Sequence, residues 1–365
     1  MREQLMTAMI GLLAFLAIGE LIYALALKKQ VHTYRDTLSS IALGIGQQAI
    51  NIYLAASFLG VWDWIHVNYG VVAADMGTWW HWVPFILACD LSYYCAHRAG
   101  HTVNFWVAAH VVHHHAKDFN YLSSFRQSWV AWGVNFPFFL PLALFVPLKM
   151  FVFGQLGIMF LQFLSHNGVY RGRLGVLDRI FVTPANHRVH HGLNQPYLNA
   201  NCGGMFVIWD RVFGTYVEED PSIPIELGTS FELNFHDPFE ANLDYYRRLV
   251  FATRHRRGWR NKLALWFESP AVLLAELDAL NYDAVPRQQL HLEALAMHDK
   301  LYAGAATVVL IGVFAFHRIG FAGNSNAMRL ATGVGVMLVM AVIGRQISAA
   351  GVADQNDERE SVAAK

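Results

Sequence analysis

Eight of the 18 histidines in this 365-residue chain fall into three short patterns. One pattern is a pair four residues apart and the other is His-x-x-His-His, which occurs twice; the residues are His97 and His101, then His110, His113 and His114, and finally His187, His190 and His191. On a helix, side chains at i, i+3 and i+4 lie within about one turn of each other. Imidazoles that converge on one point bind a cation well but gain little by burying one another. The spacing therefore predicts a metal centre.

The chemistry of such a centre can be narrowed from the residues. Ligation by imidazole alone suits iron, zinc or copper. A hydrolytic zinc enzyme would ordinarily place a glutamate base beside its histidines, and neither His-x-x-His-His pattern contains one. Oxidation of an unactivated C–H bond needs a redox cofactor that makes a strong oxidant from dioxygen. The histidines therefore favour an oxidising enzyme that uses dioxygen; the alternative is a histidine-rich metal-binding or metal-transporting membrane protein.

Electrons for such an enzyme must come from another molecule. The three cysteines, Cys89, Cys95 and Cys202, are too few and too scattered for an iron–sulfur cluster or a disulfide framework. The chain also has no GxGxxG dinucleotide fingerprint. We expect an external electron-donor protein or a small reductant as a partner.

The composition indicates a membrane protein, because 55% of the residues are hydrophobic and only 15% are charged. A net charge of zero gives no reason to expect nucleic acid as a partner. The predicted fold is all-α: a polytopic membrane helix bundle with a cytoplasmic helical cap that carries a histidine-rich metal site. Seven spans are expected, over residues 6–27, 38–62 and 79–96, two arms of a hairpin at 128–165, and 301–317 and 328–347. The alternative for 128–165 is a pair of re-entrant arms.

The positive-inside rule orients these spans. Lys28, Lys29 and Arg35 follow the first span, whereas residues 61–78 contain no Lys or Arg. His97 is then expected at the cytoplasmic end of the third span, just beneath the lipid. The predicted location is a multi-pass integral membrane protein, in the inner membrane of a bacterium or the endoplasmic reticulum of a eukaryote, with the histidine site on the cytoplasmic side.

Polar sequence between the spans completes the predicted domain organisation. An arginine cluster within 247–260 is expected to contact anionic lipid headgroups, or an acidic electron donor, and residues 263–290 are expected to form one amphipathic interfacial helix. Pro137 and Pro141 predict a kinked first arm of the hairpin. The domains are then 1–37 (first span and basic loop), 38–250 (catalytic), 251–299 (basic and interfacial), 300–348 (two-span hairpin) and 349–365 (disordered tail).

Metal-bound imidazoles usually donate their second ring N–H to a partner that orients the ring. Asp90 lies seven residues before His97, on the same helix face, and other carboxylates and amides surround the third histidine pattern. The candidate partners are Asp90, Asp178, Asn186, Asn201 and Asp210. His115 falls outside the repeated pattern and is expected to lie behind the ligands or in solvent.

The motifs AHRAGH, HVVHHH and NHRVHH, with NCGGMFVIWDRVFGTY downstream, resemble the histidine boxes of the fatty acid hydroxylase and sterol desaturase superfamily of membrane di-iron oxygenases. DLSYYCAHRAGH, DFNYLSSFRQS and HRVHHGLNQPY resemble its alkylglycerol monooxygenase-like members, which cleave ether lipids. The resemblance covers roughly residues 35–250.

The resemblance implies two iron ions held by the eight box histidines and by His166, which matches a further histidine before the last box. It implies a lipid substrate: an ether lipid, a sterol or a fatty acyl chain, hydroxylated or desaturated. Tetrahydrobiopterin is a possible further cofactor. Lys117 and Phe119, however, stand where the ether-lipid members tend to have an acidic residue and a tyrosine, whereas Asp118, Asn120, Arg126 and Gln127 match.

Overall fold

A computed structural model of the chain describes residues 2–72, 74–230 and 236–282. This part of the chain is all-helical, and its only β-type pairing is an isolated bridge between Phe181 and Phe206. Its α-helices are α1 (Arg2–Ala26), α2 (Tyr34–Tyr69), α3 (Trp79–Thr102), α4 (Asn104–His114), α5 (Ala131–Asn135), α6 (Leu148–Ser165), α7 (Pro184–His190), α8 (Ile208–Val212), α9 (Pro238–His255), α10 (Trp259–Phe267) and α11 (Pro270–Ala279). Its 3-10 helices are η1 (Ser123–Phe125), η2 (Phe136–Phe138), η3 (Leu140–Leu144) and η4 (Gly175–Arg179).

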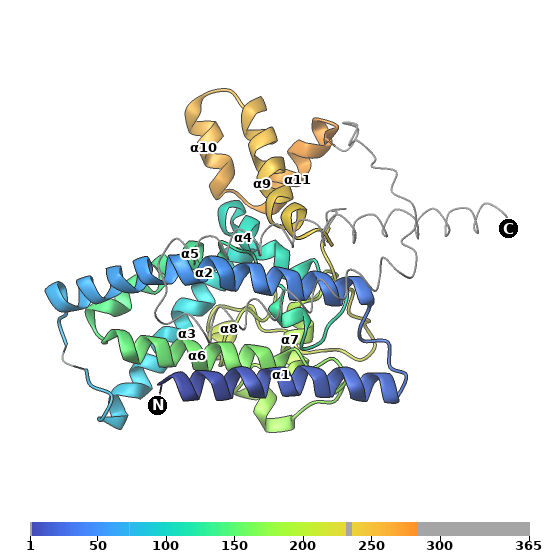
Figure 1. Cartoon of the computed structure of the whole chain (residues 1–365). Helices are drawn as coiled ribbons and strands as arrows, with labels where there is room; N and C mark the ends of the chain where they lie inside the picture. Colours follow the sequence, from blue (N-terminus) through green and yellow to red (C-terminus); the bar gives the residue numbers. More distant parts are fainter. Residues whose placement is uncertain (1, 73, 231–235, 283–365) are drawn as a thin grey trace.

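Four long helices, α1, α2, α3 and α6, form the main body of the protein (Figure 1). Thr33 caps α2, because its side chain accepts a hydrogen bond from the Asp36 N–H at 3.4 Å. The helix then continues past the end predicted at residue 62 and stops only at Gly70. The Glu20 carboxylate on α1 accepts hydrogen bonds from the Tyr121 and Gly168 N–H groups, both at 2.7 Å. This buried carboxylate joins α1 to the two segments that follow His115 and His166.

One helix in the described ranges, α6, is long and apolar enough to cross a membrane, and a shorter apolar stretch covers Gly11–Ala26. The helix α6 coincides with the second arm of the predicted hairpin. The other predicted spans stay predictions, and those at 301–317 and 328–347 lie, with the predicted tail, outside the described residues.

The first arm of the predicted hairpin is not one kinked helix. It is broken into the short pieces α5, η2 and η3. Pro137 and Pro141 stand at the beginning of η2 and η3, respectively. Proline has no N–H to donate and its ring collides with the preceding turn of an α-helix, so two prolines four residues apart leave no room for regular α-helix between them.

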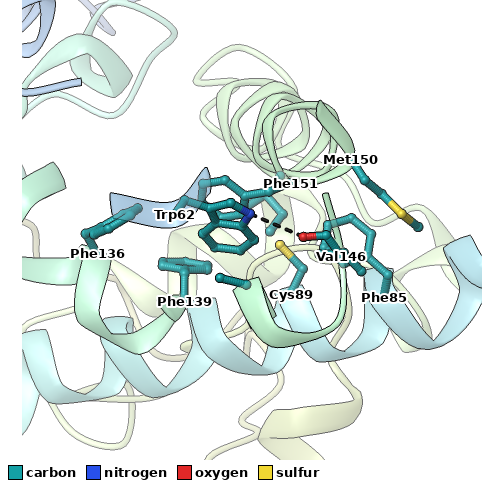
Figure 2. Packing of buried hydrophobic residues seen from close by; sticks show 10 residues of the cluster. Trp62, Phe85, Cys89, Phe136, Phe139, Val146, Met150 and Phe151 are labelled. Carbon is teal, nitrogen blue, oxygen red and sulfur yellow. Dashed lines mark hydrogen bonds between the residues drawn. The ribbon is translucent and has the colours of Figure 1, made fainter. Parts of the chain in front are cut away.

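An aromatic cluster holds this broken arm against α2, α3 and α6 (Figure 2). Trp62 of α2 is fully buried and stacks on Phe151 of α6, with 3.9 Å between the ring centroids. Its indole N–H donates to the Val146 carbonyl at 3.3 Å. Phe136 and Phe139 fill the same cluster. Each large buried side chain of this kind contributes about 1.5–3 kcal/mol, so the arm is held by packing where regular hydrogen bonding is lost.

The helices α9, α10 and α11 form a lobe that packs on α4 (Figure 1). Val107 and Val111 of α4 meet Tyr245 and Leu249 of α9. Asn104 ties the two parts together, because its amide donates to the Leu265 carbonyl and accepts from the Tyr245 hydroxyl, both at 2.7 Å. The amphipathic helix predicted over 263–290 is instead split into α10 and α11, since a proline opens α11. The residues beyond 282 are outside the described ranges.

Candidate metal centre

The structure brings all nine predicted histidines together, in two adjoining clusters. They come from the end of α3, from α4, from the end of α6 and from α7 with its C-cap. Within each cluster the candidate ligand atoms lie within 4.8 Å of one another. The first cluster contains His97, His101, His110, His114 and His190, and the second contains His113, His166, His187 and His191.

The two His-x-x-His-His patterns are each divided between the clusters. In the second box His110 and His114 join the first cluster, and His113 joins the second. In the third box His187 and His191 join the second cluster, whereas His190 joins the first. At about 100° per residue, i and i+4 are about 40° apart around a helix, while i+3 lies about 60° to the other side. Each box therefore serves two neighbouring points and not one.

A sharp turn between α3 and α4 brings the first two boxes together. The single residue Val103 separates the helices, and its extended backbone (φ −126°, ψ 118°) ends the first helix and begins the second. Gly100 makes the close approach possible. A Cβ at this position would stand 3.0 Å from both Cβ and Cγ of His110, which is tighter than ordinary van der Waals contact.

Backbone carbonyls fix the orientation of four of the rings. The Nδ1 atoms of His97, His113, His166 and His190 lie 2.9, 3.1, 2.7 and 2.9 Å from the carbonyl oxygens of Cys202, Arg126, Gln162 and Ala200, respectively. A carbonyl oxygen only accepts, so each Nδ1 donates its proton and each Nε2 carries the lone pair of a neutral imidazole. This is the tautomer that ligates a metal through Nε2.

The inward-facing nitrogens fit a cation. The Nε2 atoms of His113 and His166 are 3.2 Å apart, yet both carry lone pairs, so neither can donate to the other. The pairs His110–His114, His166–His187 and His187–His191 approach to 3.1, 3.2 and 3.3 Å through the same atoms. Two nitrogens bound to one metal at about 2.1 Å, at angles between 90° and tetrahedral, stand about 3.0–3.4 Å apart. The donor sets therefore match metal sites.

Unpartnered nitrogens in the first cluster also indicate a metal site. Within the described part of the chain, the Nε2 atoms of His97, His101 and His190 are buried and have no hydrogen-bond partner. A buried polar atom without a partner is costly unless a ligand or ion satisfies it. Three such atoms in one cluster are what a metal ion would satisfy.

Burial also keeps the imidazoles neutral. Removal from water lowers the pKa of all nine, and the positive charge that neighbouring imidazoles would carry lowers most of them further. The pKa values of His166 and His190 fall to about 4. At neutral pH these rings are unprotonated, as metal ligation requires.

Residues 82–215, which carry every one of these histidines, match the family model described as fatty acid hydroxylase. The chain belongs to the fatty acid hydroxylase family. Members of this family are dioxygen-dependent lipid hydroxylases and desaturases, which are membrane oxidoreductases.

The curated relatives agree with this family. Alkylglycerol monooxygenase of Xenopus tropicalis is 30% identical over 256 residues, which are 69% of this chain and 56% of the relative. The Homo sapiens enzyme of that name is 30% identical over 64% of this chain and 52% of its own length. Ornithine lipid hydroxylase OlsE of Rhizobium tropici is 32% identical over 36% of this chain and 40% of the relative. The chain thus spans about half the length of the alkylglycerol monooxygenases, and no solved structure matches it.

The five polar residues predicted to orient the rings of this fatty acid hydroxylase family site lie one layer further out. In the described chain these residues bond backbone groups or neighbouring side chains such as Thr183 and Thr215, and the rings bond carbonyls instead. Asp210 accepts from the Cys202 and Gly203 N–H groups at 2.7 and 2.9 Å, next to the carbonyl that holds His97. Asp90 accepts from the Met205 and Phe206 N–H groups at 2.6 and 3.1 Å. The carboxylates therefore fix the loop that presents the carbonyls.

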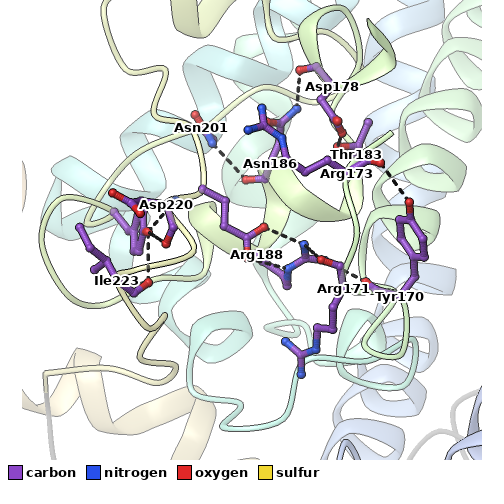
Figure 3. Close-up of polar contacts among 12 residues, drawn as sticks. Tyr170, Arg171, Arg173, Asp178, Thr183, Asn186, Arg188, Asn201, Asp220 and Ile223 are labelled. Atoms are coloured by element: carbon purple, nitrogen blue, oxygen red, sulfur yellow. Dashed lines mark hydrogen bonds and ion pairs between the residues drawn. The ribbon is translucent and has the colours of Figure 1, made fainter. Parts of the chain in front are cut away.

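The remaining three support α7, which carries the third box (Figure 3). Asn186 donates to the Asp178 carbonyl at 2.8 Å, and Asn201 donates to the Asn186 carbonyl at 3.1 Å. The Thr183 hydroxyl donates to the Asp178 carboxylate at 2.5 Å. Arg188, which follows His187 and is almost fully buried, donates to the Tyr170 carbonyl at 3.0 Å and pairs with Glu219 at 2.7 Å. This network holds the short helix in place.

Two residues near the clusters were missed as site residues by sequence reasoning. The Asn199 side chain hydrogen-bonds His101 and raises its pKa against the effect of burial. The buried ring of Phe119 stacks on His166 with centroids 5.5 Å apart and meets His191 edge-on at 5.3 Å. Phe119 was noticed only as a departure from the ether-lipid members. Its proximity to the second cluster could not be read from a pattern of histidines.

His115 lies in neither cluster, as expected from the box pattern. It is not solvated, however, because only 2% of its surface is exposed. Burial, together with the positive charges of Arg126 and Arg248, lowers its pKa. The ring thus belongs to a buried polar region on the side of α4 that faces α9, behind the metal centre.

Proposed function

We propose that this protein is a membrane-bound, non-haem di-iron oxygenase that uses dioxygen and external electrons to hydroxylate or desaturate a C–H bond of a lipid. One observation carries the proposal: two adjoining clusters of neutral imidazoles, seven of them buried and two, His101 and His110, partly buried, whose Nε2 atoms are spaced for shared metal ligands. Membership of the fatty acid hydroxylase family supports iron as the metal.

In this proposal the histidines would bind the metals, and the groups around them orient the rings. His97, His101, His110, His114 and His190 would hold one iron, and His113, His166, His187 and His191 would hold the other. The irons would supply the oxidising chemistry with dioxygen, which no side chain can supply alone. The carbonyls of Arg126, Gln162, Ala200 and Cys202 keep four rings in the ligating tautomer. Burial of seven of the nine rings would limit the access of bulk water to the metals.

The substrate class rests on the relatives. Their names include an alkylglycerol monooxygenase, an ornithine lipid hydroxylase and a Delta(7)-sterol 5(6)-desaturase. We propose that the chain acts on an ether lipid, a sterol or a fatty acyl chain. We propose an electron-donor protein as the first reductant to test and tetrahydrobiopterin only as the second, because Phe119, which packs on the second cluster, stands where the ether-lipid members tend to have a tyrosine.

The proposed setting is a bilayer crossed seven times, with the metal centre at its cytoplasmic face and residues 38–250 as the catalytic domain. The charge asymmetry of the loops supports this orientation. Single cysteines introduced at Asn68 and at Asn194 should react with a membrane-impermeant reagent from opposite sides. Reaction from the same side would contradict the topology.

The function is tested on the full chain purified in detergent. We expect two iron atoms per chain and, with a reductant, oxidation of one lipid in a panel of alkylglycerols, ornithine lipids, sterols and phospholipids. Under ¹⁸O₂, hydroxylation adds one labelled oxygen to the lipid, whereas desaturation removes two hydrogens. His113→Ala should abolish both products, while His255→Ala, at an exposed position on α9, should keep them. Tightly bound zinc with no lipid oxidation under any reductant would refute the proposal.

A further inference from the structure

An exposed apolar patch lies beside the third histidine box, on η4, α8 and the residues that adjoin them. Between 45% and 65% of each side chain in it is exposed; the patch consists of Val176, Leu177, Ile180, Ile208, Val212 and Phe213. Backbone bonds from the Val182 N–H to the Met205 carbonyl (2.9 Å) and from the Val207 N–H to the Ile180 carbonyl (3.1 Å) hold the two segments side by side. Large contiguous apolar patches on a protein surface mark a contact with a partner or a membrane.

Contacts to α3 set the depth of this patch. The Asp90 carboxylate binds the N–H groups of Met205 and Phe206, and the Phe213 ring stacks on Tyr94 with centroids 5.1 Å apart. Asp90 lies six residues before the end of the proposed span at 79–96, which is about 9 Å along a helix. Interfacial elements bury their apolar faces about 5–10 Å into the boundary between headgroups and acyl chains. The patch therefore stands at the depth of that boundary.

The exposed charged side chains within the two patch segments are basic. The Glu218 carboxylate, outside these segments, pairs with Arg173 at 3.0 Å, and the charges of Arg179 and Arg211 also help to lower its pKa. In segments 174–180 and 207–213 the acidic residues Asp178 and Asp210 are buried and engaged in hydrogen bonds. The exposed charged side chains there are Arg179 and Arg211, and the Arg211 guanidinium rests 4.3 Å above the Tyr216 ring. Arginines at the rim of an apolar face can reach lipid phosphates while their stems cover apolar surface.

We propose that the apolar patch is inserted into the cytoplasmic leaflet of the bilayer, with Arg179 and Arg211 bound to phospholipid phosphates. The inference rests on the proposed position of α3 as a membrane span. It extends the proposed function, because the same segments lead directly into α7 and into the Cys202 carbonyl that orients His97. Insertion of the patch thus sets the depth of the metal centre beneath the lipid.

Site-specific fluorescence in vesicles tests the insertion. The full chain is used with Cys95→Ser, which leaves the two buried cysteines Cys89 and Cys202. An environment-sensitive dye is placed on Val176→Cys or Val212→Cys in vesicles of phosphatidylcholine and phosphatidylglycerol. Lipids with a nitroxide near the headgroup should remove at least about half of the emission, and aqueous iodide should remove little.

Two exposed positions serve as controls. Leu198→Cys (43% exposed) is matched in exposure but lies in a polar loop, so iodide and not the lipid nitroxide should quench it. Val83→Cys (52% exposed), on α3, should be quenched by lipids with a deeper nitroxide. If lipid nitroxide quenches the label at Val83 but iodide quenches the label at Val176, the insertion of the patch is refuted while the proposed span is kept. The patch would then be a contact surface for a protein partner. Loss of lipid quenching at Val83 would overturn the proposed span and the inference with it.

The arginine contact is tested separately with the double variant Arg179→Gln, Arg211→Gln. Quenching of the Val176 label should increase with the fraction of phosphatidylglycerol in the unchanged protein and should not respond to it in the variant. An unchanged response in the variant would refute the contact between these arginines and phosphate.

Discussion

Replacement of single histidines in the two clusters should lower iron affinity by different amounts. The variants are His110→Ala, in the cluster of five, and His113→Ala, in the cluster of four. The controls are His115→Ala, which is buried beside the clusters but belongs to neither, and His255→Ala, which is exposed on α9. All four variants lose the same side chain, so any difference in iron binding between them comes from the position of the histidine.

The magnitude follows from the number of ligands. A structural metal site of four ligands binds with about 10–16 kcal/mol, so one ligand contributes about 2.5–4 kcal/mol. At about 1.4 kcal/mol for each tenfold change, His113→Ala should weaken its site about 60- to 700-fold. If a similar free energy is shared among the five ligands of the other cluster, His110→Ala should weaken that site about 30- to 200-fold.

The measurement is iron retained per chain after dialysis against a series of chelators of graded affinity. His113→Ala should lose one iron to a weaker chelator than His110→Ala does. Both controls should keep two irons throughout. Because His115 is buried, its variant is compared by thermal unfolding as well, so that a loss of fold is not mistaken for a loss of ligand.

Two results would refute this reasoning. Equal loss of iron in His115→Ala and His113→Ala, with both variants folded, would mean that the clusters are drawn around the wrong residues. Full retention of two irons in His113→Ala would overturn the two-metal site itself.

Three further predictions follow from the site and its packing. Gly168→Ala should destabilise the protein by about 1–3 kcal/mol, because the new Cβ would collide with the Phe119 carbonyl oxygen. The control Gly157→Ala, whose Cβ would have its nearest neighbour at 4.0 Å, should be tolerated. Similar melting temperatures for the two variants would contradict this prediction. Iron-free protein should lose stability as the pH falls from 6.5 towards 4. The pKa of His166 and of His190 is lowered to about 4 in the folded protein, so the unfolded chain takes up protons first. Urea unfolding midpoints that do not change over this pH range would contradict the prediction. Lipid oxidation should stop without added reductant, since the chain contains no flavin, haem or iron–sulfur motif of its own; turnover with dioxygen alone, after peroxide is excluded, would disprove an external donor.

Much of the metal centre could be predicted from the sequence, because metal ligation imposes spacing on residues that lie close together in the chain. The eight histidines of the spacing pattern lie together, and so does His166, which was added from the family resemblance and not from its spacing. The division of each box between two clusters was not predicted, since the three imidazoles were treated as one face of a helix. The orienting groups were not predicted either. Backbone carbonyls such as those of Ala200 and Cys202 leave no trace in residue type, whereas the carboxylates that attracted notice act on the backbone.

The fold shows the same division between local and non-local causes. The beginning of α3 and the whole of α6 were predicted correctly, because apolar runs and aromatic residues mark them directly. The broken arm before α6 depends on how much packing around Trp62 and Phe136 can compensate for two prolines, and this is a property of the assembled cluster. The separation of α10 from α11 was missed because the amphipathic pattern continues across Pro270.

The division of the histidine boxes links the positions of the two candidate metal sites. Neighbouring residues of one helix turn, such as His113 and His114, or His190 and His191, face different clusters. The separation of the two metal positions is therefore set mainly by the rise and rotation of an α-helix, which are nearly invariant, and not by the loops between helices. Within α4, His110 and His114 belong to one cluster and His113 to the other, so any displacement of this helix would carry ligands of both clusters together.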